Sequence, residues 1–365
     1  MALGLAAALS LSFLSHAPNR LASGRAIALI ELAPALLALP VLLLIMGVFM
    51  PPTRRWQLAS AVGNAALLLG LLWTAGDAAT HLAEGATLAR TSLGAGFWVL
   101  AAVCLLAIAD ALQGWIAAVV AAGLACGLAL MLAGGALDQL ALMKEYANRQ
   151  ELFHDALRRH LQIVLTTLLP ALLIGLPLGV AAARSRRLGQ ALFPVLNLIQ
   201  TIPSIALFAL LIAPLALLAA AWPQLGRWGF AGIGLAPAVL ALVLYSLLPI
   251  TRSTAAGLQQ VPAAVLDSAR GMGMTPRQIF WRVEVPIALP LLLAGLRVAT
   301  VQTVGLAVVA SLIGAGGLGS LIFQGLLSSA ADLVLLGVLP VLALGLLADA
   351  MFRALSRAWA GERAR

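Results

Sequence analysis

The sequence predicts an all-α, polytopic membrane protein with about ten transmembrane helices. Of its 365 residues, 62% are hydrophobic and only 10% are charged, whereas about one quarter of the residues of a soluble domain are charged. The apolar residues gather in stretches near the roughly 20 residues that cross a bilayer core, separated by polar or Pro- and Gly-rich breaks. Because lipid offers no partners to backbone polar groups, we expect these stretches to be helices.

Five apolar stretches with few polar residues make up the first part of the chain. The first, at 2–15, is short and Ser-rich and has no basic segment before it. We therefore interpret it as a short helix rather than a cleaved signal peptide. The others are expected at 26–50, 58–75, 93–109 and 115–132. We assign residues 1–135 to an N-terminal accessory group of helices.

A charged, amphipathic segment at 136–160 divides the chain and is expected to connect two groups of helices on the periplasmic side. Five further stretches follow, at 161–183, 191–221, 230–250, 287–312 and 333–352. We assign residues 161–355 to a C-terminal core and residues 356–365 to a cytoplasmic tail. All the distinctive motifs lie in this core, so we expect it to be the working module.

The arginines predict the orientation. Nearly all the positive charge behind the net charge of +9 is arginine, and most of it lies in loops that the alternation of spans places on one side: around Arg54, Arg184 and Arg252, and in the tail from Arg353. Basic loops are typical of the cytoplasmic side, so both termini are expected there. Arg20 and Arg25 fall on the opposite side and do not fit. Arginines scattered in this way give no indication of nucleic-acid binding.

The polar loop at 251–286 is expected to fold as a helix–turn–helix on the cytoplasmic face. The sequence predicts a short helix at 263–272, a turn and restart at Gly273, Thr275 and Pro276, and a second helix at 277–285 that ends at Pro286. Small side chains and glycines in this loop let another protein approach the backbone closely. A DNA-binding helix–turn–helix is the competing interpretation, and the position between two membrane spans argues against it.

The loop resembles the EAA loop of ABC-importer permeases, written E-A-A-x3-G-x9-I-x-L-P. Asp267, Ser268 and Ala269 stand at the E-A-A positions, Gly273 at the glycine, and Val283, Val285 and Pro286 at I, L and P. The resemblance implies that the five C-terminal helices form an ABC-importer permease core and that the loop couples it to a separate ATP-binding subunit. The coupling residues expected on this basis are Asp267, Ser268, Ala269, Arg270, Gly271, Gly273, Pro276, Val283 and Pro286.

Three flanking segments, 200–204, 244–252 and 312–323, are similar to those of osmoprotectant permeases, which belong to glycine betaine, choline and carnitine importers. Segments 17–20, 89–97 and 144–150 are similar to the extended Yeh-type branch of that family. The resemblance implies a permease in the bacterial inner membrane that pairs with itself or with a second permease. It also implies an ABC ATP-binding subunit and a periplasmic substrate-binding protein as partners.

Polar residues within the C-terminal spans indicate a candidate translocation path. Pro194, Pro203 and Pro214 predict a kinked or interrupted helix, which frees backbone carbonyls, and such breaks are tolerated where they line a cavity. The candidate path residues are Gln200, Thr201, Pro203, Ser204, Gln302 and Thr303. The alternative is that these groups only hold the helices together by hydrogen bonds.

No catalytic residue, metal ligand or cofactor site is assigned. A P-loop needs GxxxxGK[ST], and the lysine of this chain, Lys144, follows Ala-Leu-Met, so ATP is expected on the partner subunit and the chain is not expected to be an enzyme. The cysteines and histidines show no metal-binding spacing. The alternative function is an ion-coupled secondary transporter, which usually carries carboxylates inside the membrane, whereas Glu31, Asp110 and Asp349 are predicted near span ends.

Overall fold

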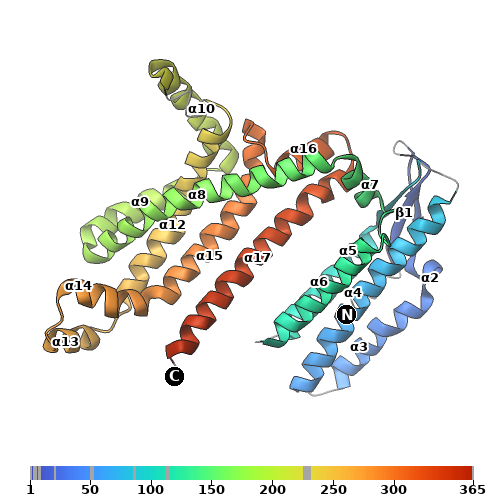
Figure 1. The fold of residues 1–365 in the computed structure, drawn as a ribbon, viewed down its shortest axis with the longest axis horizontal. Coiled ribbons are helices and arrows are strands. Elements are labelled where there is room, and N and C mark those ends of the chain that lie inside the picture. Colours follow the sequence, from blue (N-terminus) through green and yellow to red (C-terminus); the bar gives the residue numbers. More distant parts are fainter. Residues whose placement is uncertain are drawn as a thin grey trace. The chain divides into compact units, whose positions relative to one another are not determined.

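The computed structural model describes residues 2, 6, 10–19, 22–49, 53–84, 88–111, 115–224 and 232–363. The predicted helical membrane fold is confirmed. Six of the described helices are long and apolar enough to cross a membrane: Arg54–Ala83, Gln150–Arg184, Ser204–Ala221, Leu235–Gln259, Pro276–Ile313 and Ala331–Trp359. The chain divides into two compact units, Met1–Asn148 and Arg149–Arg365, whose α-helices are labelled in Figure 1.

Helix α4 (Arg54–Ala83) is the longest helix described in the first unit, where α3 (Ala38–Phe49), α5 (Ala95–Ala111) and α6 (Trp115–Ala133) all pack against it. The Thr53 hydroxyl caps its start by accepting a hydrogen bond from the Trp56 N–H at 3.3 Å. Leu67, Leu71 and Ala75 of α4 are buried in one apolar cluster with Phe97 and Cys104 of α5. The packing of α4 therefore organises this unit.

A three-stranded antiparallel sheet, which the span prediction did not anticipate, lies in the same unit. Its strands are β1 (Leu14–Ala17), β2 (Arg25–Ile27) and β3 (Arg90–Leu93), in the order β2-β1-β3. Two predicted spans change as a result. The stretch at 2–15 ends in β1, and residues 3–5 and 7–9 lie outside the described residues. The stretch at 26–50 is divided into the end of β2, α2 (Leu29–Leu32), the 3-10 helix η1 (Pro34–Leu37) and α3.

The sheet contains Arg25, one of the two arginines that do not fit the predicted orientation. Arg25 lies in β2, with 82% of its side chain exposed and its guanidinium 3.9 Å from the Glu31 carboxylate. Arg20 lies outside the described residues. The segment just before β1 and the start of α5 are in close backbone contact, since a Cβ on Gly94 would lie 2.3 Å from the Ser12 carbonyl oxygen.

In the second unit, helix α12 (Leu235–Gln259) packs against both α8 (Gln150–Arg184) and α15 (Val285–Val309), and α17 (Ala331–Arg363) packs against α15 and α16 (Leu318–Leu327) (Figure 1). Gly179 allows α8 to approach α12 closely, because a Cβ there would lie 2.5 Å from the Thr254 Cβ and 2.8 Å from the Thr251 carbonyl oxygen. Such small-residue contacts are typical of membrane helix packing.

The expected connector at 136–160 is divided between the units. Its first part contains α7 (Ala141–Asn148) in the first unit, and its second part forms the first turns of α8, a helix of 35 residues. Likewise, residues 356–363 of the expected tail continue α17, and residues 364–365 lie outside the described part of the chain.

Two breaks in the predicted helices come out differently. The stretch at 191–221 is interrupted at Pro203, as predicted, into α9 (Arg186–Thr201) and α10 (Ser204–Ala221), whereas Pro194 and Pro214 lie inside these helices. The prediction that the second loop helix ends at Pro286 is wrong. Helix α14 (Pro276–Ile279) runs through a π-helical turn, η2 (Phe280–Glu284), directly into α15. A π-turn changes the hydrogen-bond register, and proline is tolerated in the first turn that follows, where Pro286 stands.

Candidate functional site

The first helix of the 251–286 loop, α13 (Ala263–Gly271), presents most of its side chains to solvent. Ala269 is 1% exposed and anchors the helix. Asp267 and Arg270 are exposed and form an ion pair at 2.7 Å, and the Ser268 hydroxyl donates to the Ala264 carbonyl at 2.8 Å. The outward face of α13 is therefore a small, charged surface available to a partner.

The turn after α13 has a defined geometry. Gly273 has a φ of +76°, the left-handed conformation that glycine adopts without steric cost. Its N–H donates to the Arg270 carbonyl at 2.9 Å, and the Met274 N–H donates to the Ala269 carbonyl at 3.2 Å. These two bonds form a Schellman motif, so the helix ends where the sequence predicted a turn.

The second loop helix begins with a capping box. The Thr275 hydroxyl accepts from the Gln278 N–H at 3.3 Å, the Gln278 side chain accepts from the Thr275 N–H at 2.8 Å, and Pro276 occupies the first turn. A Cβ at Gly271 or Gly273 would meet no atom within 4 Å. The loop is thus locally ordered, and the space around its glycines is open.

The root of the loop contains an ion pair that the sequence analysis did not single out. Glu284 is 4% exposed, and its carboxylate accepts from both terminal nitrogens of Arg184, one of them at 2.9 Å. The Arg184 guanidinium also lies 6.0 Å from the centre of the Phe280 ring. A carboxylate within a short apolar run was the available signal, but nothing in the sequence names its partner, which lies 100 residues away.

Two of the predicted path residues meet at the break between α9 and α10. The Gln302 side chain donates to the Gln200 side-chain oxygen at 3.3 Å, and the Gln200 side chain donates to the Tyr245 carbonyl at 2.5 Å. The Tyr245 hydroxyl donates to the Ile202 carbonyl, which is one of the carbonyls that the break exposes. Tyr245 was not among the predicted path residues, because a tyrosine in an apolar span is usually a packing residue.

The remaining path candidates do not join this network by any described contact. Thr303 is buried and lies 3.0 Å from the Ser246 hydroxyl, oxygen to oxygen. Thr201 is exposed and donates to the Leu198 carbonyl at 2.7 Å. Pro203 precedes α10, and Ser204 begins it half-buried. The candidates thus fall into the linked glutamine pair, Thr303 in a separate buried hydroxyl pair, and three residues at the break between α9 and α10.

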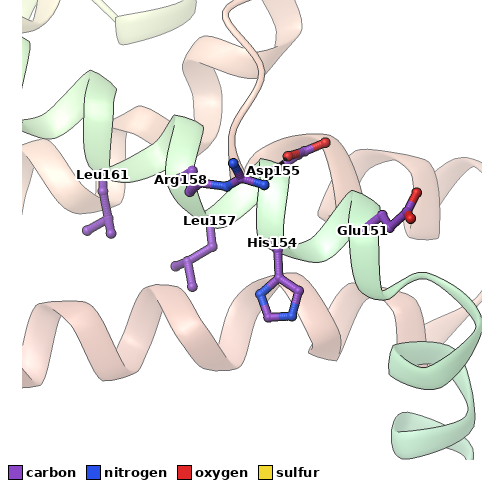
Figure 2. Close-up of a pocket in the computed structure, with 6 residues that line it drawn as sticks. All are labelled: Glu151, His154, Asp155, Leu157, Arg158 and Leu161. Atoms are coloured by element: carbon purple, nitrogen blue, oxygen red, sulfur yellow. Dashed lines mark hydrogen bonds and ion pairs between the residues drawn. The ribbon is translucent and has the colours of Figure 1, made fainter.

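An open pocket of about 580 Å³ lies along the first turns of α8. Figure 2 shows its lining residues, which all come from α8: Glu151, His154, Asp155, Leu157, Arg158 and Leu161. Arg158 and Asp155 pair with each other at 2.7 Å. Since the described lining groups come from one helix and do not converge, we assign no solute site there. Among the described residues, no group of three or more His, Cys, Asp or Glu side chains is placed to hold a metal ion.

Comparison with known proteins gives two family matches that together cover most of the chain. Residues 175–361 match the family described as "Binding-protein-dependent transport system inner membrane component". Residues 1–143 match the family described as "ABC transporter permease YehY, N-terminal domain".

Curated relatives resemble about half of the chain. The glycine betaine/carnitine/choline transport system permease protein OpuCD of Bacillus subtilis is 37% identical over 203 residues, which cover 55% of this chain and 81% of the relative. The osmoprotectant import permease protein OsmW of Salmonella typhimurium is 39% identical over 191 residues, which cover 52% of this chain and 84% of the relative.

A solved structure has a similar fold. A chain of the MetNI methionine ABC transporter in an inward-facing conformation superposes with a TM-score of 0.51 and 24% sequence identity. The match covers 57% of this chain and 97% of that one.

Proposed function

Because this chain belongs to the family of binding-protein-dependent transport system inner membrane components, we propose that it is the permease of an ATP-binding-cassette importer for a quaternary-ammonium osmoprotectant such as glycine betaine. The substrate class follows the names of relatives that act on glycine betaine, carnitine and choline. The name of the osmoprotectant import permease protein OsmW, 84% of which is covered by the alignment, supports the same substrate class.

The observation that carries the proposal is the geometry of the part of the 251–286 loop that contains α13 and α14, the 263–279 loop. A docking element needs a fixed shape before it binds, and this loop has one, with a Schellman turn at Gly273 and a capping box at Thr275. It also needs an accessible surface, and Met272 is 75% exposed beside two glycines with open space around them. We infer that an ATP-binding subunit docks here.

The energy source is assigned to that partner. Lys144, the lysine that a P-loop would require, is in α7, where its ammonium donates to the Ala89 carbonyl at 3.0 Å. ATP is thus proposed to bind and react on the ATP-binding subunit, and this chain is proposed to hold no cofactor. A periplasmic binding protein is proposed to deliver the solute.

The linked pair of Gln200 and Gln302 is proposed to line the path. Amide N–H groups donate to a carboxylate, and glycine betaine presents a carboxylate together with a cation that needs no hydrogen bond. Near this pair, Thr201 is exposed and Ser204 is half-buried. Both belong to a helix break, whose backbone polar groups need polar neighbours within a membrane. A second copy of the permease, sharing the path, would supply such neighbours. We therefore propose a homodimer.

The proposed orientation places the 251–286 loop and the C-terminus in the cytoplasm of a bacterial cell, and the strands and α7 on the periplasmic side. The helix ends are consistent with this, since α4 begins at Arg54, α8 ends at Arg184 and α17 ends at Arg363.

The described side chains give no support to an ion-coupled transporter. A coupling carboxylate should be free to exchange its ion, but Asp349 is paired with Arg353 at 2.5 Å and lies 3.6 Å from Arg297. Two guanidinium groups on one carboxylate indicate a fixed charge cluster between α15 and α17, which supports packing of the bundle.

The test is stimulation of ATP hydrolysis by the loaded binding protein. The permease in lipid nanodiscs is combined with its ATP-binding subunit and binding protein, and the ATPase rate is measured with glycine betaine, choline, carnitine or an amino acid. We expect stimulation by a quaternary-ammonium solute. Stimulation by the amino acid alone contradicts the substrate class, and failure of the ATP-binding subunit to bind the permease contradicts the permease assignment.

A further inference from the structure

The Arg184–Glu284 ion pair stands at the point where three elements of the second unit meet. Glu284 is the last residue of the π-helical turn that links the loop to α15. Arg184 is the last residue of α8, and the next residue, Ser185, caps α9 by accepting from the Leu188 N–H at 3.3 Å. The pair therefore joins the root of the loop to the corner between α8 and α9.

The environment of the pair makes it a firm contact. The Glu284 side chain is 5% exposed, whereas the Arg184 side chain is 55% exposed, so the carboxylate is removed from water and depends on the arginine for its compensation. Both terminal nitrogens of Arg184 reach the carboxylate, a fork geometry that also fixes direction. A buried charge that loses its partner is strongly disfavoured, so the two residues are expected to move together.

Helix α9 runs from this corner to the candidate path. It has 16 residues, which corresponds to about 24 Å at 1.5 Å per residue. Its apolar side, including Leu196 and Ile199, packs in one cluster with Leu247 and Ile250 of α12. Its far end carries Gln200, which is bound to the Tyr245 carbonyl and to Gln302. Helix α9 is thus a continuous element with the ion pair beside its start and the glutamine pair at its end.

We propose that the Arg184–Glu284 ion pair is the positioning contact that passes movement of the 263–279 loop to α9, and so to the Gln200–Gln302 pair. Neither residue touches solute or ATP in this account. When the ATP-binding subunits pull on the loop, the π-turn moves Glu284, Glu284 moves the α8–α9 corner through Arg184, and α9 shifts the glutamine pair. This inference rests on the proposed function.

The prediction concerns the number of solute molecules imported per ATP hydrolysed. Without the ion pair, the loop still docks and the ATP-binding subunits still hydrolyse ATP, but less of the movement reaches α9. For Glu284→Gln and Arg184→Gln we expect this ratio to fall about fivefold to tenfold, with the affinity of the ATP-binding subunit unchanged. Arg184→Lys keeps the charge but not the fork, so we expect an intermediate ratio.

The matched control is Arg187→Gln. Arg187 is exposed and lies three residues beyond Arg184 on the same cytoplasmic corner, so its loss removes an equal charge without touching the pair. We expect it to leave the ratio unchanged. The experiment uses the complete complex in proteoliposomes, with thermal stability measured for each variant, and ratios are compared among variants that melt within a few degrees of the wild-type protein.

Each result decides the matter. A fall in the ratio for both glutamine variants, a smaller fall for Arg184→Lys and none for Arg187→Gln support the proposal. A wild-type ratio in Glu284→Gln overturns it, as does an equal fall in Arg187→Gln, and loss of ATP-binding-subunit affinity places the pair in docking instead. Absence of ATP-driven uptake in the wild-type complex contradicts the proposed function itself and is seen before any variant is measured.

Discussion

The turn at Gly273 offers a perturbation whose size follows from the backbone. Gly273 has a φ of +76° and Gly271 has none in the left-handed range, and an added Cβ at either position would meet no atom within 4 Å. Gly273→Ala and Gly271→Ala therefore add the same methyl group to the same open surface. They differ only in the backbone conformation that the new residue must adopt.

An L-residue held in the left-handed conformation costs about 1–2 kcal/mol relative to glycine. Gly271 ends a helix, where alanine instead favours the helix by about 0.5–1 kcal/mol. If the ATP-binding subunit binds only the Schellman turn, the Gly273→Ala loop must adopt this strained conformation when it docks. Since 1.4 kcal/mol corresponds to a factor of ten in the dissociation constant, the affinity for the ATP-binding subunit is expected to fall about fivefold to thirtyfold. Gly271→Ala is expected to keep or slightly improve affinity.

The assay is titration of the ATP-binding subunit onto the permease in lipid nanodiscs, with the dissociation constant read by biolayer interferometry. Thermal unfolding of the permease is recorded in parallel and is expected to be unchanged, since the loop makes few buried contacts. Wild-type affinity in Gly273→Ala refutes the reasoning about the turn. Equal weakening by both variants shows that the added methyl, rather than the backbone conformation, disturbs the interface.

Three further predictions concern other parts of the chain. Gly179→Leu forces α8 away from α12 and is expected to destabilise the protein by about 3 kcal/mol, which is measured as a lower melting temperature. The control is Gly305→Leu, which is expected to leave the melting temperature unchanged because a Cβ at Gly305 would meet no atom within 4 Å. Gln200→Leu is expected to lower solute uptake about tenfold through loss of charge-assisted hydrogen bonds, with ATP-binding-subunit affinity unaltered; normal uptake counts against the path. Glu145→Gln leaves Arg90 without its buried carboxylate, which is 2% exposed, and is expected to cost roughly 3 kcal/mol, measured by thermal unfolding of the purified chain.

The long helices of the second unit could be predicted because hydrophobicity is decisive in a membrane. Apolar runs near 20 residues must satisfy their own backbone hydrogen-bonding groups within a membrane. The runs that form most of α8, α12, α15 and α17 could therefore be expected to be helical. The turn at 273–276 was equally readable, since Gly273, Thr275 and Pro276 each carry a local conformational preference that needs no tertiary context.

The sheet could not be predicted in the same way. Strands β1 and β3 pair Leu14 with Leu93, and four-residue segments show no period from which such distant pairing could be read. The apolar content of 2–15 and 26–50 therefore predicted helices where part of the chain pairs as strands. The prediction of a helix end at Pro286 was wrong for a related reason. Proline disrupts a helix interior but is tolerated in a first turn, and the π-turn that precedes Pro286 cannot be recognised from the sequence.

In the candidate site, too, features that depend on local sequence could be predicted, whereas contacts between distant residues could not. The loop residues Asp267 to Gly273 formed a recognisable spacing, whereas Glu284 and Tyr245 bond to groups that are distant in the sequence. Such partnerships appear only once the helices are packed. Gln200 and Gln302 were selected as polar groups in apolar spans, and their hydrogen bond shows them in contact, while their role in transport stays a prediction.

The most direct test of the central claim is uptake of radiolabelled glycine betaine into proteoliposomes that contain this chain, its ATP-binding subunit and its binding protein. It is measured with and without ATP, and again with Gly273→Asp in the loop. We predict uptake that requires ATP and is abolished by the substitution while the permease remains folded. Uptake that proceeds without the ATP-binding subunit and follows an ion gradient would contradict the account.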